Sequence, residues 1–202
     1  MAVTTIRRRT VTGQVHFGSY EYAGAVTAVD LVNGLAVDHA FGRPVQPADP
    51  APAIQVILER DPTWPPVRRR DVPGLVALAK QLRSVFRSIH DGDLDGAARH
   101  LNDLLAAHPA YPHLAKDGGH WRLHHHPGDA TLVPMATAIS AEALARIVGA
   151  GAANRLGTCD SDDCDRVFLD ESKNGSRRFC STTCQNRVKA AAFRRRHATV
   201  KD

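Results

Sequence analysis

All four cysteines of the 202-residue chain lie between Cys159 and Cys184, and the rest of the chain has none. They form a Cys-x4-Cys pair, Cys159 and Cys164, and fifteen residues later a Cys-x3-Cys pair, Cys180 and Cys184. A disulfide framework would distribute its bridges through the fold, whereas two closely spaced pairs are typical of zinc. We therefore predict one zinc ion on these cysteines, with disulfides or ordinary buried thiols as alternatives. Since four ligands close the coordination sphere, the zinc would be structural rather than catalytic.

The residues around the cysteine pairs predict how this metal site folds. Residues 167–169 are suited to a strand, residues 174–175 (Asn-Gly) to a turn, and residues 178–179 to a returning strand. A helix is expected from about Thr183, with Cys184 in its first turn. The order of knuckle, hairpin, knuckle and helix is that of a treble-clef zinc module.

Basic residues gather on the predicted C-terminal helix. From Arg155 onward the chain has 11 Lys/Arg and 7 Asp/Glu, whereas the earlier part has 15 and 14, and the formal net charge is +5. An exposed basic helix suits the DNA major groove, where arginine reads guanine and basic side chains hold phosphates. Compensation of the zinc–thiolate charge is an alternative for the bases near the cysteines, but it explains Arg194, Arg195 and Arg196 poorly. The predicted DNA contacts are Arg177, Arg178, Gln185, Asn186, Arg187, Lys189, Arg194, Arg195 and Arg196.

The upstream part has the apolar periodicity of a mainly helical domain with small β-hairpins. Helices are predicted over residues 22–37, from Asp71 to 89, from Asp93 to 105 and from Pro134 to 148, and residues 54–58 suit either strand or helix. The change in composition near residue 154 divides the chain into three parts. These are a flexible basic arm (1–20), a helical domain (21–153) and a zinc module with a basic helix (154–202).

A histidine-rich segment, HWRLHHHP, alternates like a strand, and residues 131–133 are predicted to pair with it. Trp121, His124 and His126 are candidates to line a ligand pocket. A catalytic metal on the two histidines is an alternative, but the chain has no His-Glu-x-x-His spacing. Histidines hydrogen-bonded within the core are the more ordinary interpretation.

Other patterns narrow the classes of function. No run approaches the roughly 20 apolar residues of a membrane span, and no apolar segment follows the basic N-terminus as in a secretory signal. We therefore expect a cytoplasmic protein with no membrane partner. The chain also has no nucleophile motif and no phosphate loop, so we expect no enzyme.

The segment CDSDDCDRVFLDESKNGSRRFCSTTCQNRVKAAAFRRRH resembles the CGNR zinc finger of bacterial transcription regulators. Gln185 replaces the glycine of the Cys-Gly-Asn-Arg run, while Cys184, Asn186 and Arg187 match it. Upstream, AVTAVDLVNGLA and HWRLHHHP are similar to parts of the ABATE domain that precedes this finger. The resemblance implies a helical ABATE-like domain followed by a treble-clef-like finger, in a stress-associated regulator that binds DNA.

Two functions from different classes are compatible with these features. The first is a DNA-binding transcriptional regulator, nucleoid-associated when bound, whose N-terminal domain senses a small molecule or forms a homodimer. The alternative is a zinc-stabilised adaptor that binds proteins, and an enzyme using His124 and His126 is a weaker third. If the zinc is structural, its chelation should unfold residues 157–197 and leave the N-terminal domain largely helical.

Overall fold

The computed structural model of the chain describes residues 19–60, 64–109, 111–117, 119–126 and 130–198. The predicted arm therefore lies outside the described residues except at its end, where the first helix already begins at Ser19. The α-helices are α1 (Ser19–Leu35), α2 (Pro50–Leu58), α3 (Val72–His90), α4 (Leu94–Ala107), α5 (Leu132–Gly149) and α6 (Thr182–Ala198). Short 3₁₀ turns occur at Arg69–Asp71 and Ala153–Arg155.

The described strands form antiparallel pairs. Strand β1 (His39–Ala40) pairs with β2 (Arg43–Pro44), β3 (His113–Asp117) with β4 (His120–His124), and β5 (Leu156–Thr158) with β6 (Val167–Leu169). The expected mainly helical fold with small hairpins is therefore confirmed. Two predicted pairings are wrong. Strand β4 pairs with the preceding β3, and residues 132–133 belong to α5 instead. Strand β6 pairs with β5 rather than with residues 178–179.

Side-chain caps fix several helix starts. Asp93, where this helix was predicted to start, caps α4, because its carboxylate accepts a hydrogen bond from the Gly96 amide at 2.8 Å. Asp71 acts one turn earlier than predicted, since its carboxylate accepts from the Arg68 amide at 2.9 Å within the 3₁₀ turn before α3. The undecided run at residues 54–58 is helical, and its helix starts after Asp49, which accepts from the Ala51 amide.

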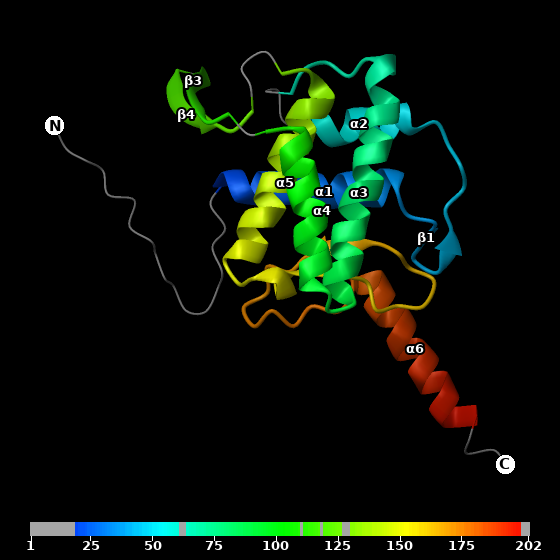
Figure 1. Ribbon diagram of the computed structural model, residues 1–202. Coiled ribbons are helices and arrows are strands. Elements are labelled where there is room, and N and C mark those ends of the chain that lie inside the picture. The colour runs from blue at the N-terminus through cyan, green and yellow to red at the C-terminus, as the bar shows by residue number, and fades with distance from the viewer. Residues whose placement is uncertain (1–18, 61–63, 110, 118, 127–129, 199–202) are drawn as a thin grey trace.

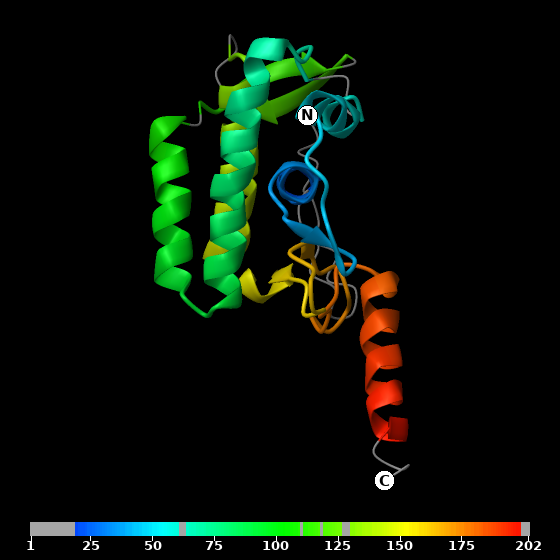
Figure 2. The same cartoon turned by 90° about the vertical axis from the view of Figure 1, so that its right-hand side faces the viewer.

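Helices α3 and α5 form the middle of the helical body. Helix α4 packs on one side of this pair and α1 crosses the other side, as the two views in Figure 1 and Figure 2 show together. The crossing with α5 is close at Gly24, where an added Cβ would lie 2.7 Å from both the Ala143 Cβ and the Ile139 carbonyl oxygen. Glycine is therefore the residue that this contact requires. Of the helices that the structure describes, α5 alone is long and apolar enough to span a membrane, and 61% of that segment is buried in the body.

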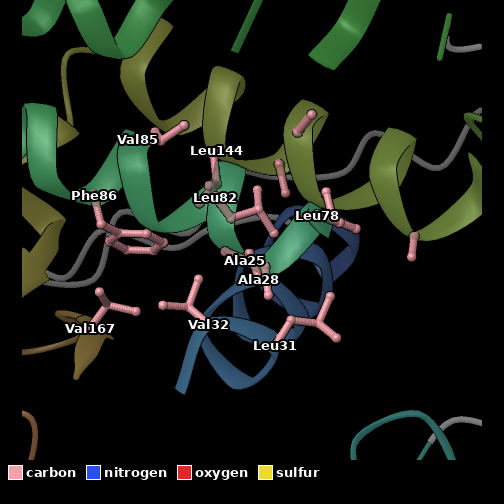
Figure 3. Packing of buried hydrophobic residues seen from close by; sticks show 14 of the residues in the cluster. Ala25, Ala28, Leu31, Val32, Leu78, Leu82, Val85, Phe86, Leu144 and Val167 are labelled. Carbon is pink, nitrogen blue, oxygen red and sulfur yellow. The ribbon is translucent and has the colours of Figure 1, made fainter. Parts of the chain in front are cut away.

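The hydrophobic core continues from the helical body into the cysteine-rich segment. Leu156, Val167 and Leu169 of the β5–β6 hairpin are buried in the same cluster as the helix side chains. Figure 3 shows Val167 facing Phe86 of α3 and Val32 of α1. The division of the chain at residue 154 stays a prediction, and the two parts that it separates share one core.

Candidate metal centre and nucleic-acid interface

The four cysteine thiols lie close together in the finger. All four sulfur atoms lie within 4.8 Å of one another. The Cys164–Cys180, Cys180–Cys184 and Cys184–Cys164 sulfur pairs are 3.8, 3.7 and 3.6 Å apart. Sulfur atoms at the corners of a tetrahedron around zinc, each about 2.3 Å from the metal, are about 3.8 Å apart. The cluster therefore has the size and the donor set that tetrahedral zinc requires.

The protonation of the thiols also favours a bound cation. A hydrogen bond from the Cys180 thiol is the largest cause that lowers the pKa of Cys159, to about 5, and the Cys180 amide donates to the same sulfur. Burial raises the pKa of Cys164, and the hydrogen bond to Cys159 raises the pKa of Cys180. Thiolates this close repel one another, so a divalent cation is needed to keep the cluster ionised.

The loop between the cysteine pairs is tied down by Asp170 and Arg177. The buried Asp170 carboxylate accepts from the Ser172 amide at 2.7 Å and from the Arg177 amide at 2.8 Å. The Arg177 guanidinium donates to the carbonyl oxygens of Leu169, Phe179 and Cys180. Arg177 thus links β6 to the second cysteine pair, and its donors point into the finger rather than toward a partner.

Helix α6 begins at the second cysteine pair, as predicted. Ser181 precedes it, and the Ser181 hydroxyl accepts from the Cys184 amide at 3.3 Å. Cys184 therefore lies fully buried in the first turn, where free amides favour a thiolate. Val188, Ala191 and Ala192 are half-buried, so they form the side of α6 that packs on the finger.

The outer side of α6 is accessible and mainly polar. Figure 1 and Figure 2 show the helix extending away from the body. The exposed residues among the predicted DNA contacts on this helix are Gln185, Asn186, Lys189, Arg194, Arg195 and Arg196. Arg187 differs from them because it is half-buried and donates to the Ser161 hydroxyl and the Asp162 carbonyl. Its guanidinium also lies against Gly42 of the β1–β2 turn, where the positive φ of 82° and the lack of space both favour glycine.

Residues far apart in the sequence join the finger to the helical body. The Asn33 amide of α1 donates to the Val167 carbonyl at 3.0 Å and accepts from the Val167 amide at 2.9 Å. The Asp165 carboxylate accepts from the Asp38 and His39 amides and lies 3.3 Å from the Arg83 guanidinium of α3. Through these contacts α1 and α3 fix the orientation of the finger.

Comparison with protein families gives two matches. Residues 155–197 match the CGNR zinc finger, and residues 25–156, more than half of the chain, match ABATE, described as "Putative stress-induced transcription regulator". The chain belongs to the ABATE family. A search of curated proteins found no match. The two matches and their order confirm the resemblance seen in the sequence.

Membership in these families shows a coarse function. An ABATE protein with a CGNR finger is a regulatory zinc-binding protein, and the four clustered cysteines fit one structural zinc ion. Both families are regulatory or zinc-finger families rather than enzyme families.

The structure separates the three residues predicted to line a ligand pocket in the ABATE domain. Trp121 is 65% exposed and faces Lys116, whose ammonium lies 5.2 Å from the ring centre. His124 lies on the other face of the hairpin, with the ring centres of His113 and His126 at 5.5 and 5.3 Å. The structure brings His124 and His126 together without Trp121, so a ligand site on all three stays a prediction.

The residues at the joint of the CGNR finger were missed in the sequence. Asn33 lies in a mainly apolar helix, and its partner Val167 is 134 residues away. Asp165 stands one position after Cys164, where a surface acid is unremarkable. Neither residue carries a local motif, so only the tertiary structure shows their roles.

Proposed function

We propose that this ABATE protein is a DNA-binding transcriptional regulator whose CGNR finger presents α6 to the DNA duplex. One observation carries the proposal: α6 extends from the body with polar and basic side chains exposed. By contrast, the guanidinium groups of Arg177 and Arg187 are bonded within the finger. A basic helix with one exposed side is suited to the major groove.

The positions of the exposed side chains along α6 suit them to different kinds of DNA contact. Gln185, Lys189 and Arg196 are four and seven positions apart along the helix, so they share one face of α6, which lies beside the packed Val188 and Ala192. We assign base contacts to Gln185, Asn186 and Lys189, near the start of the helix, and phosphate contacts to Arg194, Arg195 and Arg196. Arg178 is 72% exposed and paired with Asp160 at 2.7 Å, so it would add a phosphate contact only by leaving that pair.

The contacts of Arg177 and Arg187 within the finger argue against both residues as DNA contacts. Arg177 donates to the carbonyl oxygens of three residues, and Arg187 to two groups of the 161–162 loop. We propose that both residues hold the shape of the finger and do not contact DNA. Their substitution would then reduce DNA binding by disordering the finger.

Other parts of the proposal concern partners and location. Double-stranded DNA is the main partner, and the protein is cytoplasmic and associated with the nucleoid when bound.

A homodimer would raise specificity, because a single finger reads few base pairs. The exposed face of the β3–β4 hairpin, with Leu114, Trp121 and Leu123, offers apolar area for such a contact.

A salt series with fluorescently labelled genomic DNA fragments tests the proposal. We expect the double variant Lys189→Gln/Arg196→Gln to bind more weakly. Its slope of log K against log salt should be less steep by about 0.9 for each lost phosphate contact. The double variant Arg60→Gln/Arg99→Gln removes the same charge from exposed sites on the helical body and serves as the control.

The outcomes separate the two classes of function. Equal affinities and equal slopes for both double variants would exclude α6 as the DNA-binding helix. If the zinc-loaded protein bound no duplex DNA but captured an acidic protein through α6, the adaptor alternative would replace the proposal.

A further inference from the structure

A cleft of about 300 Å³ opens beside α3 at the junction with the finger. Its walls come from one side of α3 and from the chain segment that connects α1 to β1. The lining residues are Leu35, Ala36, Val37, Asp38, Lys80, Arg83, Ser84 and Arg87. Three of them are cations on successive turns of α3, and Asp38 is the one acid among them. The cleft therefore carries an excess of positive charge.

The three cations of this cleft differ in their exposure and in their bonding partners. The Arg83 side chain is 19% exposed, and its guanidinium donates to the Ala36 carbonyl at 2.6 Å and to the Asp38 carboxylate at 2.9 Å. Lys80 and Arg87 are exposed, and no hydrogen bond or ion pair joins their charged groups to any residue that the structure describes. Two cations thus border the cleft with their charged groups open to an anion, and the charge of Arg87 also acts on the Asp38 carboxylate.

Among the three cations, it is Arg83 that is hydrogen-bonded to Asp38. The hydrogen bond from Arg83 is the main cause that lowers the pKa of Asp38, so this residue is a carboxylate at neutral pH. Lys80 and Arg87 remain as donors, whereas the Ser84 hydroxyl between them donates to the Lys80 carbonyl at 3.3 Å. An anion with several acceptor oxygens would satisfy this set of donors, and phosphate is the simplest such group.

We propose that the cleft binds a small effector that carries a phosphate group, with Lys80 and Arg87 as its main contacts. The site is distinct from the zinc centre, from α6 and from the histidines of the β3–β4 hairpin. It would also give the helical domain a place for the small molecule that the sequence led us to expect.

The position of the cleft suggests how the effector would act. Arg83 lies in its wall and also contacts the Asp165 carboxylate of the finger at 3.3 Å. Asp165 in turn accepts from the amides of Asp38 and His39. A bound phosphate would compete for Arg83 and weaken its contact with Asp165, so occupancy of the cleft would alter how the finger is held. This coupling, unlike the binding site itself, rests on the proposed function.

Titration calorimetry of the zinc-loaded protein with inorganic phosphate, at constant ionic strength, tests the site. We expect saturable binding of one phosphate per chain, weakened about tenfold or more in Lys80→Gln/Arg87→Gln. The control variant Arg60→Gln/Arg99→Gln should bind like the unchanged protein. Asp38→Asn should bind several-fold more tightly because it removes the carboxylate from the cleft. Absence of saturable binding, or equal binding by the Lys80/Arg87 and control variants, would overturn the proposal.

The same variants distinguish a free phosphate compound from the DNA backbone. If Lys80→Gln/Arg87→Gln reduced the salt slope of DNA binding while the unchanged protein bound no phosphate, the cations would be DNA contacts and the effector site would be wrong. Coupling is measured by the phosphate Kd of the protein alone and of its DNA complex, since binding free energies are reciprocal. A different Kd supports coupling. An equal Kd refutes coupling but leaves the site intact, and phosphate binding without DNA binding would refute only the proposed function.

Discussion

At the scale of single residues, Asp170 shows how a buried charge shapes the zinc finger. Its side chain is 1% exposed, and burial alone would raise the pKa of the carboxyl. The hydrogen bonds from Ser172 and Arg177 outweigh burial and lower that pKa instead. The carboxylate therefore holds the loop between the cysteine pairs most firmly when it is ionised.

We expect Asp170→Asn to reduce the free energy of unfolding of the zinc-loaded protein at pH 7 by about 1–3 kcal/mol. Because the pKa in the folded protein lies below the reference value of 3.8, Asp170 contributes its full stability above pH 3.8. That contribution is lost as the pH falls through the folded pKa, so the difference from the unchanged protein should shrink below about pH 4. Urea denaturation over a pH series measures it.

The exposed Asp103 of α4 provides a control. Asp103→Asn should change stability by less than about 0.5 kcal/mol at any pH. If Asp170→Asn behaved like Asp103→Asn, the hydrogen bonds of Asp170 would not be holding the loop.

A second prediction for a single residue concerns Asn33 of α1. Asn33→Ala would leave the Val167 amide and carbonyl without their partners at a buried joint, at a cost of about 2 kcal/mol or more. Thermal unfolding of the zinc-loaded variant measures the loss. Asn102→Ala, at an exposed position on α4, is the matched control. Equal stability of the two variants would show that the Asn33 contact contributes nothing to the joint.

At the scale of elements, the sequence predicted helices better than strand pairing. Periodicity and caps located α3, α4 and α6 to within a few residues, because a helix is specified by residues close in the chain. The Asn-Gly turn near residue 175 has the expected positive φ at Gly175, yet no strand pair follows it. Strand β6 instead pairs with β5, where the Phe168 ring covers Gly157.

The candidate site was predictable to a different degree in each part. The cysteine spacing specified the cluster of thiols, since zinc ligands come in such pairs. The sequence did not show which basic side chains are exposed. Arg177 and Arg187 are bonded within the finger while Lys189 is exposed, and this difference depends on contacts across the finger. The cleft beside α3 was missed because its charges face a segment more than 40 residues away.

At the scale of the whole molecule, the finger is built onto the core of the ABATE domain. Val167 contacts the side of the core formed by Val32 and Phe86, and Asn33 and Asp165 bond across the same joint. Loss of the zinc would unfold the finger and expose apolar surface on α1 and α3. Removing the metal would therefore also destabilise the parts of the helical domain that face the finger. The sequence alone predicted that chelation unfolds residues 157–197 and leaves the N-terminal domain largely helical.

The measurement that tests this account most directly is hydrogen–deuterium exchange of the protein with and without its zinc. We predict that removing the zinc increases exchange in residues 155–197 and also in the parts of α1 and α3 that face β6, near residues 28–35 and 82–89. Helix α4, which lies away from the finger, should change least and serves as an internal control. Increased exchange confined to residues 155–197 would contradict the shared core and show that the finger is an independent module.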